Sequence, residues 1–352
     1  MTRRDRLDPA IFNLPVEKMR AGYYSDKYFV RAREILLADN YRPQVTMQVF
    51  GKTHAFLGGI DEAIAILKLC SVEWSQLTVK ALHDGDEVEP WEPVLEIVGP
   101  YDAFAHLETL FLGVLARRTK VGTNTRRVVE AAFPKEVMFF PARHDHWLVQ
   151  TGDGYAAHIA GAIGVSTDAQ ASWWGNEGVG TVPHALIAVY DGDTVLATKQ
   201  FSEYIPASVQ VVSLVDFEND CVKTSLAVAE ALGERLYGVR LDTSELLVDQ
   251  SVQSQMGRFP PTGVCPQLVR NVRSALDRAG FSHVKIIVSG GFSVEKIAAF
   301  EAEAVPVDAY GVGSSLFKGR FDFTGDIVLK DGHPCAKVGR EYRPNPRLSL
   351  VE

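Results

Sequence analysis

The sequence predicts an α/β protein whose larger part is a parallel sheet with helical crossovers. Three observations support this. From about Arg117 onward, short apolar segments alternate with segments of helical spacing. Six or seven such strands over roughly 200 residues suit a barrel better than an open sheet. The first third instead mixes helical segments with alternating, β-branched ones, which predicts a separate, smaller domain.

Composition excludes several classes of protein. The chain has 352 residues, of which 46% are hydrophobic and 23% charged, and this is average for globular proteins. A net charge of -8 disfavours nucleic acid as a partner. We find neither a secretory signal nor the run of about 18 apolar residues that a membrane span needs. These features predict a cytoplasmic protein without a membrane or nucleic-acid partner.

The cysteines predict neither disulfides nor a zinc site. Cys70, Cys221, Cys265 and Cys335 are scattered, form no C-x-x-C pair and have no histidine at zinc-ligand spacing. We therefore expect reduced thiols and no structural zinc.

The smaller domain is predicted from elements of both kinds. Helical spacing covers residues 28–38, 61–69 and 103–116, and an alternating strand covers 44–50. Gly and Pro punctuate residues 82–99, which we interpret as an antiparallel unit. The β-like pieces after Phe317 could pair back onto this domain.

In the second part, strands and helices alternate. The predicted strands are 137–140, 163–166, 209–215, 238–241, 285–288 and 307–310. The predicted helices are 154–162, 183–189, 222–232, 266–279 and 294–301. Residues 199–203 and 258–261 are interpreted as loops.

Polar residues gather where these strands end, which is where parallel α/β folds place their sites. Two glycine turns follow the last strands, Ser289-Gly290-Gly291 and Gly311-Val312-Gly313-Ser314-Ser315. Such turns, each opening a helix, present backbone N–H groups to an anion, and barrels commonly bind phosphate there. The alternative is that these glycines only make tight turns.

Charged side chains end the neighbouring strands. Asp216 and Asp242 could hold Mg²⁺ with a phosphorylated sugar, or bind ribose hydroxyls. Arg143 and Arg240 supply guanidinium groups for a carboxylate or phosphate, although either could form a structural ion pair. His184 follows Pro183 at a predicted helix start, which favours a functional role. His144 and His146 flank Asp145 but lack a third metal ligand nearby.

At these residues the chain resembles the nicotinate phosphoribosyltransferases, within the wider family of nicotinate, nicotinamide and quinolinate enzymes. The resemblance covers nearly the whole chain and rests on several motifs in order. They are Tyr24-Ser25-Asp26-Lys27-Tyr28-Phe29, Phe140-Pro141-Ala142-Arg143, Ser166-Thr167-Asp168, Gly180 to Ile187, Arg240-Leu241-Asp242, Ser289-Gly290-Gly291 and Gly311 to Leu316.

The resemblance implies an incomplete α/β barrel with an N-terminal α/β sandwich domain that the C-terminal segment completes. The expected boundaries are 1–116, 117–320 and 321–352. It also implies a homodimer with shared active sites, and the reaction of nicotinate with phosphoribosyl pyrophosphate to nicotinate mononucleotide and pyrophosphate. Many members couple this to ATP through a phosphorylated histidine.

The resemblance further implies residue roles. Phe140 and the partner subunit's Tyr28 would sandwich the pyridine ring, and Arg143 and Arg240 would face its carboxylate. Asp242 and Asp216 would act on the ribose and the Mg²⁺–pyrophosphate, and His184 would be the phosphorylated histidine. The 5′-phosphate would lie on the glycine turns, at Gly290, Gly291, Gly311, Gly313 and Ser314.

One residue departs from this pattern. Asp168 lies where the polar substituent of the ring should be, and a carboxylate there suits nicotinamide better than nicotinate unless it turns away or pairs with an arginine. Nicotinamide and quinolinate therefore stay open as substrates. Two further hypotheses are a phosphosugar lyase or isomerase, for which no strand-end lysine is found, and a non-catalytic pyridine-nucleotide-binding protein.

Overall fold

The computed structural model describes residues 4–352, which form two compact units. The sandwich unit comprises the described part of Met1–Asn124 together with Tyr155–Ala160 and Phe317–Glu352. The barrel unit comprises Thr125–Gly154 and Gly161–Leu316. The division falls inside two α-helices, after Asn124 and after Gly154.

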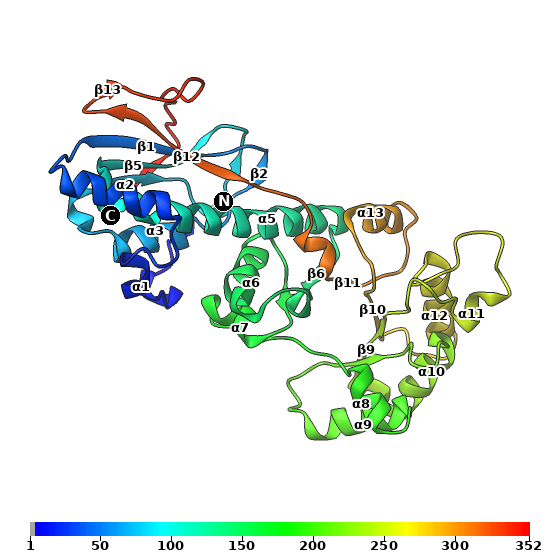
Figure 1. Ribbon diagram of the computed structural model, residues 1–352. Coiled ribbons are helices and arrows are strands. Elements are labelled where there is room, and N and C mark those ends of the chain that lie inside the picture. Colours follow the sequence, from blue (N-terminus) through cyan, green and yellow to red (C-terminus); the bar gives the residue numbers. More distant parts are fainter. Residues whose placement is uncertain (1–3) are drawn as a thin grey trace. The chain divides into compact units, whose positions relative to one another are not determined.

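The sandwich unit is built on a six-stranded antiparallel sheet, part of which is visible in Figure 1. Its strands, in spatial order, are β13 (His333–Pro334), β12 (Phe323–Lys330), β1 (Gln44–Gly51), β5 (Pro93–Pro100), β3 (Thr78–Ala81) and β14 (Ser349–Leu350). β2 (Ala55–Phe56) and β4 (Glu87–Val88) pair separately. Because β12 pairs with β1 and β14 with β3, the C-terminal segment completes this sheet, as the fold prediction requires.

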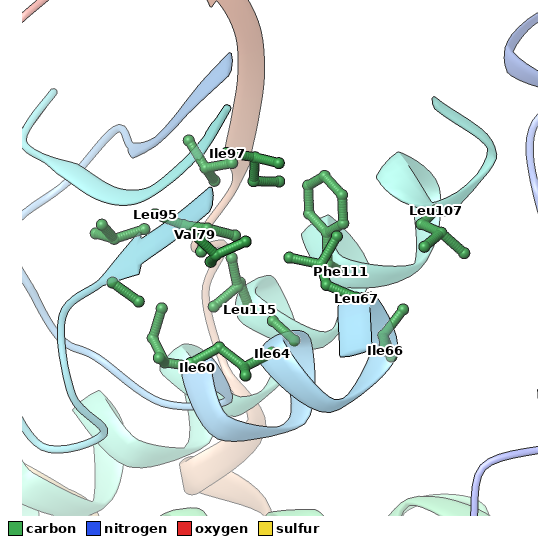
Figure 2. Close-up of a cluster of buried hydrophobic side chains, with 14 of the residues drawn as sticks. Ile60, Ile64, Ile66, Leu67, Val79, Leu95, Ile97, Leu107, Phe111 and Leu115 are labelled. Carbon is green, nitrogen blue, oxygen red and sulfur yellow. The ribbon is translucent and has the colours of Figure 1, made fainter. Parts of the chain in front are cut away.

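The sandwich unit also contains helices, several of which bury apolar side chains. They are α1 (Val16–Arg20), α2 (Lys27–Ala38), α3 (Ile60–Cys70), α4 (Tyr101–Phe104) and the first part of α5 (Glu108–Ala132). α3 begins where the Asp84 carboxylate accepts a hydrogen bond from the Ile60 amide at 2.8 Å. Ile60, Ile64 and Leu67 of α3 then pack in one buried cluster with Val79 and Leu95 of the sheet and Phe111 of α5 (Figure 2).

α5 corrects the predicted helix end at Ala116, because it continues to Ala132. The polar residues that follow Ala116 are weak helix formers. Hydrogen bonds to other parts of the chain stabilise this part of the helix instead. The Thr119 hydroxyl bonds the backbone of Gly58, and the Thr123 hydroxyl bonds that of Phe56. These threonines anchor the helix to the β2 region.

The barrel unit is built on a six-stranded parallel sheet. Its strands, in spatial order, are β7 (Gly164–Val165), β6 (Glu136–Phe139), β11 (Ala309–Val312), β10 (Lys285–Val288), β9 (Leu236–Leu241) and β8 (Val211–Leu214). The consecutive strands β7 and β8 thus lie at opposite edges, so the barrel is incomplete. Together with the sandwich unit, this confirms the predicted fold class.

One segment bonds to both edges of this sheet. The Val179 amide donates to the Val165 carbonyl of β7 at 2.7 Å, and the Val182 amide donates to the Val212 carbonyl of β8 at 3.1 Å. Residues 179–182 therefore connect the two edge strands without adding a strand between them.

Helices connect the parallel strands. They are α6 (Gln150–Ile159), α7 (Asp168–Ala171), α8 (His184–Val189), α9 (Thr194–Tyr204), α10 (Cys221–Leu232), α11 (Gln250–Gln253), α12 (Pro266–Arg278) and α13 (Val294–Ala302). Four of the predicted helices, α8, α10, α12 and α13, are confirmed. The loop predicted at residues 199–203 is wrong, since these residues lie in α9, whose start Asp193 caps by accepting from the Leu196 amide. Across residues 4–352, no helix has the length and apolar character to cross a membrane.

Candidate active site

The predicted functional residues of the barrel unit follow the carboxyl ends of its strands. Asp216 follows β8, Asp242 follows β9, Gly290 follows β10, Gly313 follows β11 and Phe140 follows β6. Because the strands are parallel, these ends share one edge of the sheet.

His184 and Asp216 form a close pair at this edge. His184 is the first residue of α8, and its Nε2 lies 2.8 Å from Oδ1 of Asp216. The hydrogen bond with Asp216 raises the pKa of His184, against the opposing effect of partial burial. The Asp216 side chain is only 7% exposed, whereas that of His184 is 45% exposed. The imidazole is thus held at one ring nitrogen while the rest of the ring stays accessible.

Arg240 of β9 lies beside this pair and has an unused donor. Its Nη1 donates to Oγ1 of Thr181 at 2.9 Å, and its Nη2 lies 3.5 Å from Oδ2 of Asp242. Its Nε is buried without a hydrogen-bond partner. Burial lowers the pKa of Arg240, and the charge of Arg143 acts in the same direction. A buried donor of this kind requires an acceptor, which a ligand carboxylate could supply.

Asp242 joins the arginine to the first glycine turn. Its Oδ1 accepts a hydrogen bond from the Ser289 hydroxyl at 2.8 Å. A Cβ atom added at Gly290 would lie 3.2 Å from the same oxygen. Gly290 and Gly291 both have positive φ, +81° and +68°, a conformation that glycine adopts without strain. The turn therefore requires its two glycines.

The second glycine segment differs from the prediction. Gly311 and Val312 are the last residues of β11 rather than part of the turn, which starts at Gly313. The predicted strand ended too early because glycine is a poor strand former. A Cβ atom at Gly311 would approach Cδ2 of Phe140 to 2.8 Å, so Gly311 makes room for this ring.

The turn itself lies beside a histidine. A Cβ atom at Gly313 would lie 3.1 Å from Nε2 of His144, and the exposed Ser314 begins a 3₁₀ helix, Ser314–Phe317. Arg143 and His144 lie in another short 3₁₀ helix, Ala142–His144, which follows Phe140. The Phe140 amide donates to the Val312 carbonyl at 2.8 Å, which joins this segment to β11.

Two further predicted site residues are Asp168 and Tyr28. The Oδ1 of Asp168 accepts a hydrogen bond from the Gly178 amide at 2.9 Å, so the carboxylate holds the start of the segment that connects β7 and β8. Tyr28 belongs to α2 of the sandwich unit, where its side chain is exposed.

Two residues that hydrogen-bond to predicted site residues are not themselves predicted as site residues. Ser289 is predicted only as part of a turn, although its position directly after a strand is a usable signal. Thr181 carries no such signal, because its bond with Arg240 depends on how residues 179–182 run between the sheet edges. The sequence pattern therefore does not predict the contact between Thr181 and Arg240.

The two aspartates suit a metal ion that arrives with a phosphorylated substrate. Mg²⁺ commonly binds through one or two carboxylates and completes its coordination with phosphate oxygens and water. No group of three or more His, Cys, Asp or Glu with metal-ligand placement occurs in residues 4–352. Asp216 and Asp242 are the residues that could hold such an ion.

An incomplete barrel whose strands end in acids, an arginine and glycine turns is what the resemblance to the pyridine phosphoribosyltransferases implies. Residues 26–119 match the family described as quinolinate phosphoribosyl transferase, N-terminal domain. The chain is similar to nicotinate-nucleotide pyrophosphorylase from Pyrococcus furiosus, whose crystal structure shares 34% sequence identity with it. The match covers 96% of this chain and 85% of the Pyrococcus furiosus chain, with a TM-score of 0.81. The chain belongs to the nicotinate and quinolinate phosphoribosyltransferase family.

Further relatives agree with this assignment. Nicotinate phosphoribosyltransferase pncB1 of Mycobacterium tuberculosis is 31% identical over 276 residues, which are 75% of this chain and 56% of that protein. The chain thus spans little more than half the length of this relative. Human nicotinic acid phosphoribosyltransferase shares the fold at 18% identity, with a TM-score of 0.66 over 88% of this chain.

Proposed function

We propose that the protein transfers the phosphoribosyl group of phosphoribosyl pyrophosphate to nicotinate, giving nicotinate mononucleotide and pyrophosphate for NAD biosynthesis. One observation carries this proposal. Asp242 lies between Arg240 and the Gly290-Gly291 turn, within reach of both. The order of these groups matches the order of the parts of nicotinate mononucleotide. Arg240 would bind the carboxylate of the base, Asp242 the ribose and the glycine turn the phosphate.

The base would bind at Arg240 and Phe140. The buried Nε of Arg240 would donate to the nicotinate carboxylate, and Arg143 adds positive charge nearby. Phe140, seated against Gly311, offers one face to the ring. We further propose a homodimer in which the partner subunit's Tyr28 covers the other face. Asp168 accepts a hydrogen bond from the Gly178 amide, which supports a position turned away from the base.

The reaction forms a bond from the ring nitrogen to the anomeric carbon and breaks that carbon's bond to pyrophosphate. Positive charge develops on the sugar, and nearby carboxylates stabilise it, as in glycosyl transfer. Asp242 and Asp216 would supply these carboxylates and would bind the ribose hydroxyls. Mg²⁺ bound to the pyrophosphate would neutralise the leaving group. The glycine turns would hold the 5′-phosphate, with Gly313 and Ser314 forming the second turn.

ATP coupling is assigned to His184. With Nε2 bound to Asp216, Nδ1 is the ring nitrogen left to attack the γ-phosphorus of ATP, releasing ADP. The negative charge of Asp216 stabilises the positive charge that develops on the ring. Partial exposure of the side chain leaves room for the nucleotide.

A substrate panel tests the proposal. Nicotinate, nicotinamide and quinolinate are each incubated with phosphoribosyl pyrophosphate and Mg²⁺, with and without ATP, and pyrophosphate release is measured. We expect release with nicotinate and stimulation by ATP. Release with quinolinate alone, accompanied by CO₂, would instead support the activity named in the N-terminal domain match. No release with any base would refute the proposed function.

A further inference from the structure

A lysine and a glutamate outside the predicted site meet at the first glycine turn. Lys296 lies in the first turn of α13, and Glu245 lies in the loop after β9. Neither was a predicted site residue, and neither has a place in the mechanism above. Both carry charge next to the position assigned to the 5′-phosphate.

The glutamate lies on the turn itself. A Cβ atom at Gly291 would collide with Oε1 of Glu245, so the carboxylate occupies the space that the missing side chain leaves. The backbone of Glu245 is packed as well, since a Cβ atom at Gly263 would lie 3.2 Å from its Cα. The Glu245 side chain is nonetheless exposed, so it can leave the turn without disturbing the core.

The lysine is held at the same turn from the other side. Its Nζ lies 3.4 Å from the Gly290 carbonyl oxygen and 4.4 Å from the centre of the buried Phe292 ring. Burial lowers the pKa of Lys296, and the charge of Glu245 opposes this effect. An ammonium group in such a partly desolvated position gains from a nearby anion. In the free protein, the carboxylate of Glu245 is an anion near Lys296.

We propose that Lys296 is a further binding residue for the 5′-phosphate, and that Glu245 takes the place of this phosphate on the turn until the substrate displaces it. Binding then exchanges one anion for another beside the same ammonium group. The inference rests on the proposed function only in its assignment of the turn to a phosphate. Glu245 lowers the affinity for the phosphate but keeps Lys296 neutralised in the free protein.

The test measures binding and needs no turnover. Ribose 5-phosphate is titrated into the full-length protein by calorimetry, with ribose as the ligand that lacks phosphate. Lys296→Met, which keeps the length but removes the charge, should weaken ribose 5-phosphate binding about tenfold or more, as expected for a charged hydrogen bond. Lys296→Arg should restore most of it. Glu245→Gln should tighten binding several-fold.

The matched control is Glu230→Gln, which removes the charge of an exposed glutamate on α10. It should leave ribose 5-phosphate binding unchanged. Equal binding by wild type and Lys296→Met, or weaker binding by Glu245→Gln, would overturn the inference. Thermal melting of each variant identifies loss of folding. If no pyridine base is turned over but these shifts in binding occur, the proposed function fails and this inference stands.

Discussion

His184 and Asp216 meet across the start of α8 and the end of β8, with 2.8 Å between Nε2 and Oδ1. The two residues are far apart in the sequence, and the fold brings them together because α8 begins directly after the segment that bonds to the β8 edge. The pair fixes which nitrogen of the ring faces the protein.

Asp216→Asn should lower the pKa of His184. The hydrogen bond with Asp216 is the largest cause of the raised value, and an amide replaces the carboxylate without its charge. NMR titration of histidine ring signals would measure the change. The ring signals of His283 in the same unit serve as a reference, since this histidine lies beside Glu234 rather than Asp216. An unchanged His184 titration would contradict the role of the pair.

The same variant should lose stability only on the acidic side. A histidine whose pKa is raised by folding stabilises the folded state below its unfolded pKa of about 6.5, and this contribution disappears as pH rises through the folded value. Wild type and Asp216→Asn should therefore differ more in Tm near pH 5 than near pH 9. The difference should be small, because the imidazole is half-exposed and solvent screens it.

Asp242→Asn should abolish most turnover while the protein stays folded. The amide keeps the size of the side chain but removes the charge beside the developing sugar cation, and a loss on the order of 10²–10³ in kcat is expected. Pyrophosphate release measures the effect. Asp308→Asn is a suitable control, because Asp308 bonds Lys285 and the Ile286 amide at the amino end of β10. Near-normal turnover by Asp242→Asn would exclude the assigned role.

Much of the barrel unit could be predicted from the sequence, because its strands are short apolar runs that end in polar residues. The strand predicted at 285–288 is β10, and the helices at 183–189 and 266–279 differ from α8 and α12 by one residue at one end. Rules for parallel sheets then place the strand-end residues on one edge. This is why Asp216, Asp242 and the Gly290 turn can be grouped from sequence alone.

The rest could not be predicted, because it depends on tertiary contacts. Nothing local marks the bond from Ser289 to Asp242 or that from Arg240 to Thr181. Residues 199–203 form a helix because an aspartate several residues earlier caps it. Glu245 lies against Gly291 of the first glycine turn, but the two residues are far apart in the sequence and share no motif.

Gly311→Ala should impair binding of the pyridine base. The added methyl group would lie 2.8 Å from the Phe140 ring and force it to move, at a cost of about 1–3 kcal/mol in stability. We expect the KM for nicotinate to rise about tenfold or more and that for phosphoribosyl pyrophosphate to change little. Gly113→Ala on α5 is the control, since nothing lies within 4 Å of its added Cβ. An unchanged KM for nicotinate would show that Phe140 does not hold the ring.

Tyr28 and Arg240 test whether active sites are shared between subunits. If the partner subunit's Tyr28 completes the site, Tyr28→Ala and Arg240→Ala should each be nearly inactive as homodimers. Mixed dimers contain one site with both native residues and should recover up to about half of wild-type activity, on the symmetry of a twofold dimer. Activity of tagged, purified heterodimers measures this. Heterodimers without recovered activity would argue against shared sites.

Glu108→Gln should stabilise the sandwich unit at alkaline pH. Burial raises the pKa of Glu108 from 4.5 to about 8, and the nearby Asp326 and Asp26 add to this effect. The folded chain therefore keeps this carboxyl protonated at pH values where the unfolded chain ionises it. Unfolding releases a proton, so the contribution of the group to stability is complete below pH 4.5 and is lost as pH rises toward 8.

Glutamine does not titrate, so the variant does not lose this contribution to stability as pH rises. The difference in unfolding free energy should be small at pH 4 and grow to a few kcal/mol above pH 8, because each tenfold change in proton affinity corresponds to about 1.4 kcal/mol. Urea unfolding at several pH values measures it. Glu17→Gln is the control, because the Glu17 side chain is 91% exposed. Parallel pH profiles for wild type and Glu108→Gln would show that the Glu108 carboxyl is ionised in the folded protein.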